Sequence, residues 1–215
     1  MTNEELIQYL ESKDIDGSED PDSLGYEIGD EVSEWPGEVF TRCGSSKCCI
    51  VFKDKKFVIK WTCDRNGADS DKDEALDEVR IYEHAKAQGL EMFFPKTEVF
   101  AEINGVFFIR QEMVDISCSD LPYITEKKYA KQSRTASERI MNKVQAAFDE
   151  VRHGRYCRTL NRTWVSMALV LYGKNIVKKF CEFAQKEGIN DLHDNNIGYK
   201  NNRPILLDFS GFERS

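Results

Sequence analysis

The sequence predicts an α+β fold in two lobes: a five-stranded lobe with one helix, then a mostly helical lobe that ends in a short β-hairpin. Three observations support this fold. Strand patterns separated by turn residues run from residue 38 to residue 114, with one helical segment among them. Helical spacing then dominates up to about residue 188, and two short apolar strands follow. With 215 residues, the chain is long enough to bury a real core.

The first 37 residues are expected to form an acidic N-terminal arm with one short helix. Thr2 and Glu5 have the spacing of a capping box, and apolar residues at helical spacing follow them. From Asp14 to Glu34 the chain is acidic and repeatedly interrupted by glycine and proline. That composition predicts a loosely structured segment.

Residues 38–114 are expected to form the first lobe. Strands are predicted at 38–43, 48–52, 57–61, 96–103 and 106–114, and a helix at 71–88. Asn104-Gly105 is a strong signal for a two-residue hairpin between the last two strands. The expected order is therefore three strands, one helix and two strands.

Residues 115–215 are expected to form a truncated helical second lobe. The best helical pattern runs from about Val165 to Lys186 and predicts one long helix. Two short strands, 197–199 and 205–207, flank a turn at 201–204 and form a terminal hairpin.

The clearest chemical signal lies around that hairpin. Asp191 precedes it, Asn196 follows five residues later, and Asp208 stands at its end. A carboxylate such as Asp191 can orient a hydroxyl group and accept its proton. The Asn196 carbonyl and the Asp208 carboxylate are hard oxygen ligands suited to Mg²⁺ on phosphates. His193 either assists the phosphates or caps the loop.

These residues resemble the motifs of the protein-kinase-like superfamily, in a small bacterial, phage-type or atypical form. Asp191-Leu192-x-x-x-Asn196 is similar to the catalytic loop, and Asp208-Phe209-Ser210 to the metal-binding Asp-Phe-Gly. Val58-Ile59-Lys60 is similar to the strand motif with the phosphate-binding lysine.

Two further segments extend the resemblance over roughly residues 38–212. Glu78, on the following helix, stands where the partner of the lysine would be, and Glu74 is the alternative. Residues 111–114, Gln-Glu-Met-Val, resemble the hinge that holds adenine through backbone groups. The matches fall in the family's order, each on the expected kind of element.

The resemblance implies a two-lobed protein-kinase-like fold and an ATP- and Mg²⁺-dependent kinase that phosphorylates a protein Ser or Thr hydroxyl. Its implied catalytic residues are Asp191, Lys60 and Glu78. Its implied nucleotide-binding residues are Gly44, Ser45, Ser46, Lys47, Lys60, Glu112 and Val114. Its implied metal ligands are Asn196 and Asp208.

The sequence also departs from the family. The phosphate loop has one clear glycine, Gly44, so a plain hairpin turn is the alternative there. Ile189-Asn190 replaces the usual His-Arg, and the sequence has seven residues after Asp208, with no activation segment. Two other functions stay open: a pseudokinase acting as an interaction module, and a small-molecule kinase. The second would need an acidic acceptor pocket, whereas the nearby helices are basic.

Charge is unevenly distributed along the chain. The net charge is -8, which argues against nucleic-acid binding as the main task. Residues 1–40 carry about -12, whereas 127–162 carry about +7. Near contact between the two segments would let the acidic arm regulate access to the basic helices. A merely solubilising arm is the alternative.

The remaining expectations concern location. No apolar run is long enough to span a membrane, and the N-terminus has no signal-peptide character. The seven cysteines include a close group at 43, 48, 49 and 63, where a zinc site is conceivable. Reduced core cysteines are the commoner outcome, which predicts a cytoplasmic protein.

Overall fold

The computed structural model describes residues 1–13, 15, 21–44, 46–63, 73–114, 134–152, 160–189 and 192–210. The chain divides into two compact units, each described by itself below. Unit 1 comprises Met1–Glu83 and Lys96–Met113, and unit 2 comprises His84–Pro95 and Val114–Ser215. The fold is α+β with a five-stranded antiparallel sheet, as the sequence predicts.

The sheet of unit 1 matches the predicted strands to within two residues at each end. Its strands are β1 (Val39–Cys43), β2 (Lys47–Phe52), β3 (Phe57–Thr62), β4 (Thr97–Ile103) and β5 (Val106–Glu112). They lie in the order β1-β2-β3-β5-β4, so β3 is central. Asn104 and Gly105 both have positive φ, 51° and 82°, as the two-residue turn between β4 and β5 requires.

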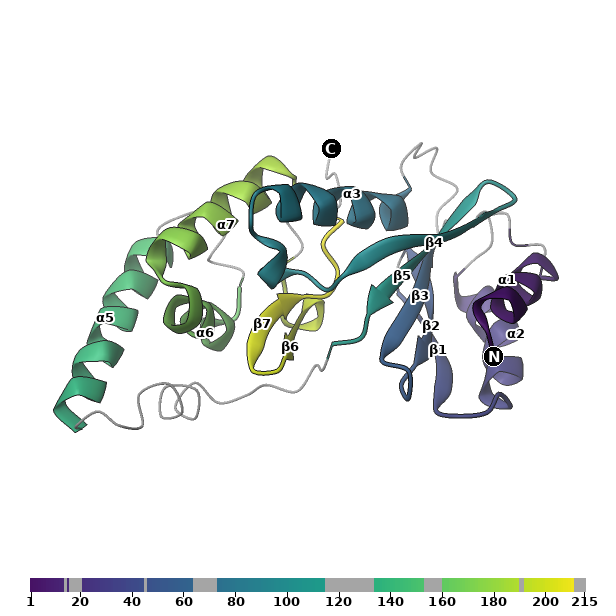
Figure 1. Cartoon of the computed structure of the whole chain (residues 1–215), viewed down its shortest axis with the longest axis horizontal. Helices are drawn as coiled ribbons and strands as arrows, with labels where there is room; N and C mark the ends of the chain where they lie inside the picture. Colours follow the sequence, from purple (N-terminus) through teal and green to yellow (C-terminus); the bar gives the residue numbers. More distant parts are fainter. Residues whose placement is uncertain are drawn as a thin grey trace. The chain divides into compact units, whose positions relative to one another are not determined.

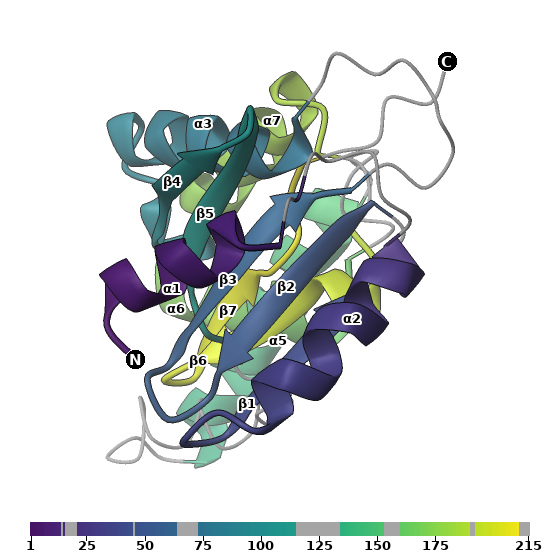
Figure 2. The ribbon, with the colours of Figure 1, turned by 90° about the vertical axis from the view of Figure 1, so that its right-hand side faces the viewer.

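One face of this sheet is covered by two N-terminal helices, α1 (Asn3–Glu11) and α2 (Pro21–Ser33) (Figures 1 and 2). The capping box of Thr2 and Glu5 is present at the start of α1, as predicted. Apolar side chains of both helices share one core with the sheet, including Leu6, Leu10, Leu24, Ile28, Val32, Ile50, Phe52, Ile59, Trp61 and Phe108. The prediction of loose structure from Asp14 to Glu34 is therefore wrong over Pro21–Ser33, where burial of the apolar residues outweighs the glycines.

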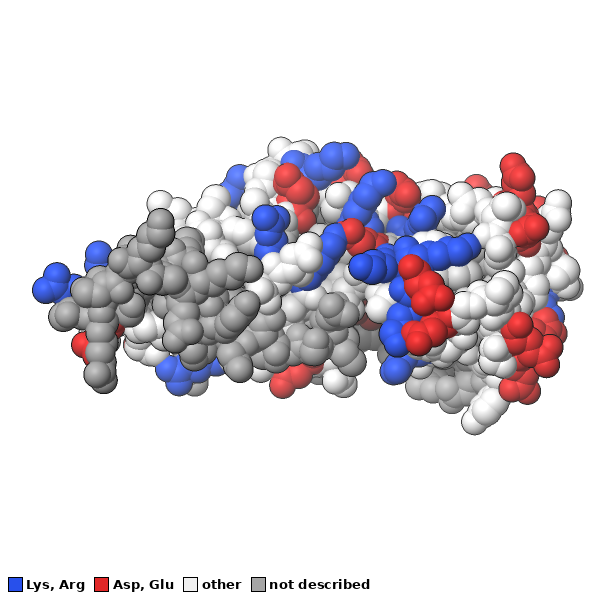
Figure 3. Space-filling view, turned by 60° about the horizontal axis from the view of Figure 1, so that its bottom comes forward, with Lys and Arg blue, Asp and Glu red and all other residues white. Residues whose placement is uncertain are grey.

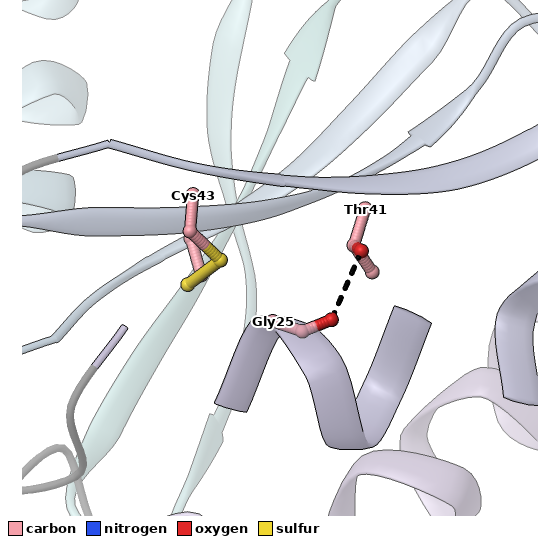
Figure 4. Close-up of a disulfide and its surroundings, with 4 residues drawn as sticks. Gly25, Thr41 and Cys43 are labelled. Atoms are coloured by element: carbon pink, nitrogen blue, oxygen red, sulfur yellow. Dashed lines mark hydrogen bonds between the residues drawn. A yellow bond between two sulfur atoms is a disulfide. The ribbon is translucent and has the colours of Figure 1, made fainter. Parts of the chain in front are cut away.

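Helix α2 approaches β1 closely at its two glycines, which lie one helical turn apart; Figure 4 shows the approach at Gly25. A Cβ atom at Gly25 would lie 2.9 Å from the Cys43 sulfur, and one at Gly29 would lie 2.9 Å from Thr41 Oγ1. The Thr41 hydroxyl donates a hydrogen bond to the carbonyl of Gly25 at 3.3 Å. These glycines, which look like helix breakers in the sequence, permit the contact between helix and strand.

We expect Gly25→Ala to destabilise unit 1 by about 1–3 kcal/mol, because the added methyl group overlaps a sulfur atom that is fixed in a disulfide. Alanine would otherwise favour the helix by about 0.5–1 kcal/mol. Urea unfolding followed by tryptophan fluorescence measures the change. Glu27→Ala, on the exposed side of α2, is the control. Unchanged or increased stability of Gly25→Ala would contradict the close contact.

Helix α3 (Glu74–Ala87) begins at a fixed point beside the end of β3. Asp73 Oδ1 accepts hydrogen bonds from the Leu76 N–H at 3.0 Å and from the Thr62 hydroxyl at 2.8 Å. The Thr62 hydroxyl oxygen in turn accepts from the Ala75 N–H at 2.9 Å. The end of β3 thus sets where α3 starts, and with it the position of Glu78 one turn later.

Unit 2 contains α5 (Arg134–Arg152), α6 (Arg162–Tyr172), α7 (Lys174–Lys186), β6 (Ile197–Lys200) and β7 (Arg203–Leu206). The predicted single helix from Val165 to Lys186 is wrong: it is two helices, divided at Gly173, whose φ of 81° does not continue a helix. Phe93, Trp164 and Phe180 pack together as the aromatic centre of this unit. The Trp164 indole N–H donates to the carbonyl of Ile205 at 3.1 Å and so fixes β7 against α6.

Charged side chains of both signs lie close together on the surface of the described residues. Lysine and arginine side chains lie interspersed with aspartate and glutamate on the face shown in Figure 3. On α5, Glu150 pairs with Lys174 and Lys178 of α7, and their hydrogen bonds lower the pKa of Glu150 to about 2. None of the helices in the described ranges is long and apolar enough to cross a membrane.

Candidate functional site

Strand β3 and helix α3 bring Lys60 and Glu78 together. The Lys60 ammonium lies 3.2 Å from Glu78 Oε2 and 3.5 Å from Oε1. The Glu78 side chain is fully buried, and that of Lys60 is 14% exposed. A buried carboxylate is tolerated only when positive charges and hydrogen bonds surround it, so this pair is a fixed feature of the unit.

A second lysine shares the same carboxylate. Lys47, the first residue of β2, lies 3.1 Å from Glu78 Oε1 and 3.4 Å from Glu74 Oε2, and only 9% of its side chain is exposed. The Ser46 hydroxyl donates to Glu74 Oε2 at 2.7 Å. The sequence left Glu74 and Glu78 as alternative partners of Lys60. In the structure Glu78 pairs with Lys60, and both glutamates pair with Lys47.

Gln111 completes the cluster, in a role that no local pattern in the sequence indicates. Its side-chain amide donates to Glu78 Oε2 at 2.7 Å and to the Thr97 hydroxyl oxygen at 3.2 Å. Gln111 is buried in β5, beside β3 in the sheet. The residue predicted as the start of an adenine hinge therefore points its side chain at the carboxylate that orients Lys60.

Two backbone N–H groups in the rest of the predicted hinge donate hydrogen bonds within unit 1. Glu112 donates its N–H to the carbonyl of Lys96 at 2.9 Å, and Met113 donates its N–H to the carbonyl of Lys56 at 3.0 Å. Val114 is buried and is the first residue of the second segment of unit 2. An adenine held at this strand would use backbone groups other than those two N–H groups.

The predicted phosphate loop is the turn between β1 and β2. Gly44 donates its N–H to the carbonyl of Lys47 at 2.8 Å, as in a hairpin turn, and Ser45 lies outside the described residues.

Cys43 and Cys48, which face each other at the base of the turn, form a disulfide (Figure 4). The expectation of reduced cysteines is wrong for this pair. Within the described ranges, no three His, Cys, Asp or Glu side chains gather, so the structure offers no zinc cluster there.

A free cysteine lies next to Lys60 on the same face of the sheet. Cys49 of β2 stands directly opposite Lys60 of β3. Burial raises the pKa of the Cys49 thiol, and the positive charges of Lys60 and Arg42 act in the opposite direction. The thiol is therefore a neutral neighbour of the lysine cluster at physiological pH.

The predicted metal ligands lie in unit 2, on the hairpin of β6 and β7. Asn196 precedes β6, and its carbonyl accepts a hydrogen bond from the Leu207 N–H at 2.8 Å, which extends the pairing of the two strands by one step. Asp208 is the next residue after Leu207, and both Asn196 and Asp208 are half-buried. The hairpin therefore brings their backbones to the same end, with the buried Phe209 anchoring the strand beyond them.

His193 caps the short turn that carries Asn196. Its Nδ1 accepts a hydrogen bond from the Asn195 N–H at 3.2 Å, so the predicted capping contact is present. A contact of His193 with phosphates stays a prediction. Asp191, the predicted catalytic base, lies outside the described residues.

The arrangement thus has two parts. Unit 1 holds two lysines, two glutamates and Gln111 in one buried polar cluster. Unit 2 holds an amide and a carboxylate at one end of a hairpin. Comparison with known proteins adds no relative: neither a protein-family model, nor a curated protein, nor a solved structure matches this chain.

Proposed function

We propose that this chain is an ATP- and Mg²⁺-dependent phosphotransferase with a protein-kinase-like fold, and that it transfers a phosphoryl group to a protein Ser or Thr hydroxyl. The observation that carries the proposal is the buried Glu78 carboxylate paired with Lys60 of the central strand. Phosphoryl transfer depends mostly on positioning and charge neutralisation, and a lysine oriented by a buried carboxylate serves both.

The donor groups at the hairpin fit a magnesium ion. Mg²⁺ prefers oxygen ligands and is commonly bound by one or two carboxylates together with phosphate oxygens. Asp208 offers a carboxylate and Asn196 an amide oxygen, at one end of the same hairpin. A bound MgATP would supply the phosphoryl group and the charge-neutralising metal.

Each residue of the chain then has a separate task. Lys60 would bind phosphate oxygens while Glu78 holds the ammonium group in place. Asn196 and Asp208 would hold the metal. Asp191 would orient the acceptor hydroxyl and accept its proton, in the loop that precedes the hairpin.

A pseudokinase is the second candidate. The β1–β2 turn has a single glycine, and a disulfide closes its base. Both features restrict the turn that would cover the phosphates of a nucleotide. Such a protein would bind nucleotide without turnover, or act only as an interaction module.

Calorimetry with ATP tests the proposal. We expect binding in the presence of Mg²⁺ and a sharp fall in affinity after chelation of the metal or in Asp208→Ala, because the carboxylate is a metal ligand. Asp194→Ala removes an exposed carboxylate from the short turn that carries Asn196 and is the matched control. Equal affinity in all four cases would remove the metal site from the proposal.

A further inference from the structure

Glu78 is surrounded by more positive charge than one lysine supplies. Its Oε1 faces Lys47 at 3.1 Å, and its Oε2 faces Lys60 at 3.2 Å and the Gln111 amide at 2.7 Å. Lys47 also faces Glu74. Among the described residues, the cluster therefore contains two lysines and two glutamates, whose formal charges balance.

This composition allows one lysine to break its contact with Glu78 without leaving the buried carboxylate uncompensated. With a single lysine on Glu78, movement of that lysine to a ligand would leave the carboxylate buried and poorly compensated, which is strongly destabilising. Here Glu78 keeps Gln111 and the other lysine whichever of the two departs. The carboxylate can thus hold the cluster together while a lysine binds elsewhere.

The positions of the two lysines suit an extended anion. Lys47 pairs with Thr62 and Lys60 with Cys49 across β2 and β3, so the lysines are diagonal neighbours on one face of the sheet. Such neighbours lie roughly 7–8 Å apart at the backbone, and long side chains easily converge from there. Lys47 also flanks the β1–β2 turn, whereas Lys60 lies within the central strand.

We propose that Lys47 is a second phosphate-binding lysine, which exchanges its contact with Glu78 for a contact with a polyphosphate chain, alongside Lys60. The proposal rests on the phosphotransferase function proposed above. It specifies that Lys47, which the resemblance implies as a nucleotide-binding residue, acts through its side chain and gives up a contact with Glu78 to do so. Gln111 is a positioning residue that keeps Glu78 in place during the exchange.

Calorimetry with two probes, MgATP and inorganic tripolyphosphate, tests the role of Lys47. We expect Lys47→Met and Lys60→Met each to weaken the binding of both probes by about tenfold to a hundredfold, the usual effect of a charged hydrogen bond. Lys53→Met is the control, because it removes the same charge from an exposed position in the β2–β3 turn.

The double variant leaves Glu78 without either lysine and is expected to lose stability. The triple variant Lys47→Met/Lys60→Met/Glu78→Gln removes the buried negative charge as well, so the loss of binding can be measured in a folded protein. We expect it to fold and to bind neither probe.

The outcomes separate the two proposals. Wild-type affinity in Lys47→Met, with weakened binding in Lys60→Met, overturns the second phosphate-binding lysine and leaves the phosphotransferase intact. Binding of tripolyphosphate through both lysines without binding of MgATP supports the lysine pair and overturns the nucleotide function. Failure of the wild-type protein to bind either probe overturns both.

Discussion

Asp191→Asn should slow phosphoryl transfer by about 10²–10⁴-fold and leave the affinity for MgATP close to that of the wild type. The asparagine side chain keeps the size of the carboxylate and loses its ability to accept a proton from the acceptor hydroxyl. Transfer of labelled phosphate from ATP to generic protein substrates measures the rate, and calorimetry measures the affinity. Because the predicted nucleotide contacts lie on other residues, the substitution should lower the rate of phosphoryl transfer without lowering the affinity for MgATP.

The control for this variant is Asp194→Asn, three residues later in the sequence, where the side chain is exposed. It should transfer phosphate at the wild-type rate. A wild-type protein that binds MgATP but transfers no phosphate and hydrolyses no ATP with any divalent metal would favour the pseudokinase. A rate for Asp191→Asn equal to that of the wild type would remove Asp191 from the mechanism.

A truncated chain that begins at Glu34 should fail to fold as unit 1. The truncation removes six fully or nearly fully buried apolar side chains from the core, Leu6, Leu10, Ile15, Leu24, Ile28 and Val32. Burial of each contributes about 1.5–3 kcal/mol. Together they match or exceed the roughly 5–15 kcal/mol by which a domain is usually stable.

Circular dichroism and thermal unfolding compare the truncated chain with a full-length control. In that control, exposed acids on the two helices, such as Glu4 and Glu27, are replaced by glutamine, so the charge falls and the core stays. We expect cooperative unfolding of the control and none of the sheet unit in the truncated chain. A well-folded truncated chain would restore the view of residues 1–37 as a detachable arm.

Much of unit 1 could be predicted from the sequence because its strands obey local rules. Runs rich in β-branched and aromatic residues, together with the Asn104-Gly105 turn, define β4 and β5 without knowledge of the rest of the chain. Helix α2 was missed because Gly25 and Gly29 count against a helix locally. Glycine is needed at these two positions because α2 closely approaches β1 there, and only the tertiary structure reveals that contact.

The candidate site divides in the same way. Lys60 and Glu78 could be identified because a strand and the following helix place them at a recognisable spacing. The resemblance implied Lys47 as a nucleotide-binding residue and Gln111 as the start of the hinge, but their contacts with Glu78 could not be predicted, because these contacts join residues separated by 31 and 33 positions in the chain. The spacing of Leu24, Ile28 and Val32, four residues apart, was the one local signal that could have found α2.

The core of unit 1 joins the two ends of its sequence, because Leu6 of α1 and Phe108 of β5 belong to the same cluster. During synthesis, the N-terminal helices emerge first and their apolar sides have no complete sheet to cover until β5 has left the ribosome. Contacts between residues so distant in sequence make folding slow, since a long loop must close before they form. The lysine cluster, which needs Gln111 from the same last strand, can therefore be completed only after β5 has emerged.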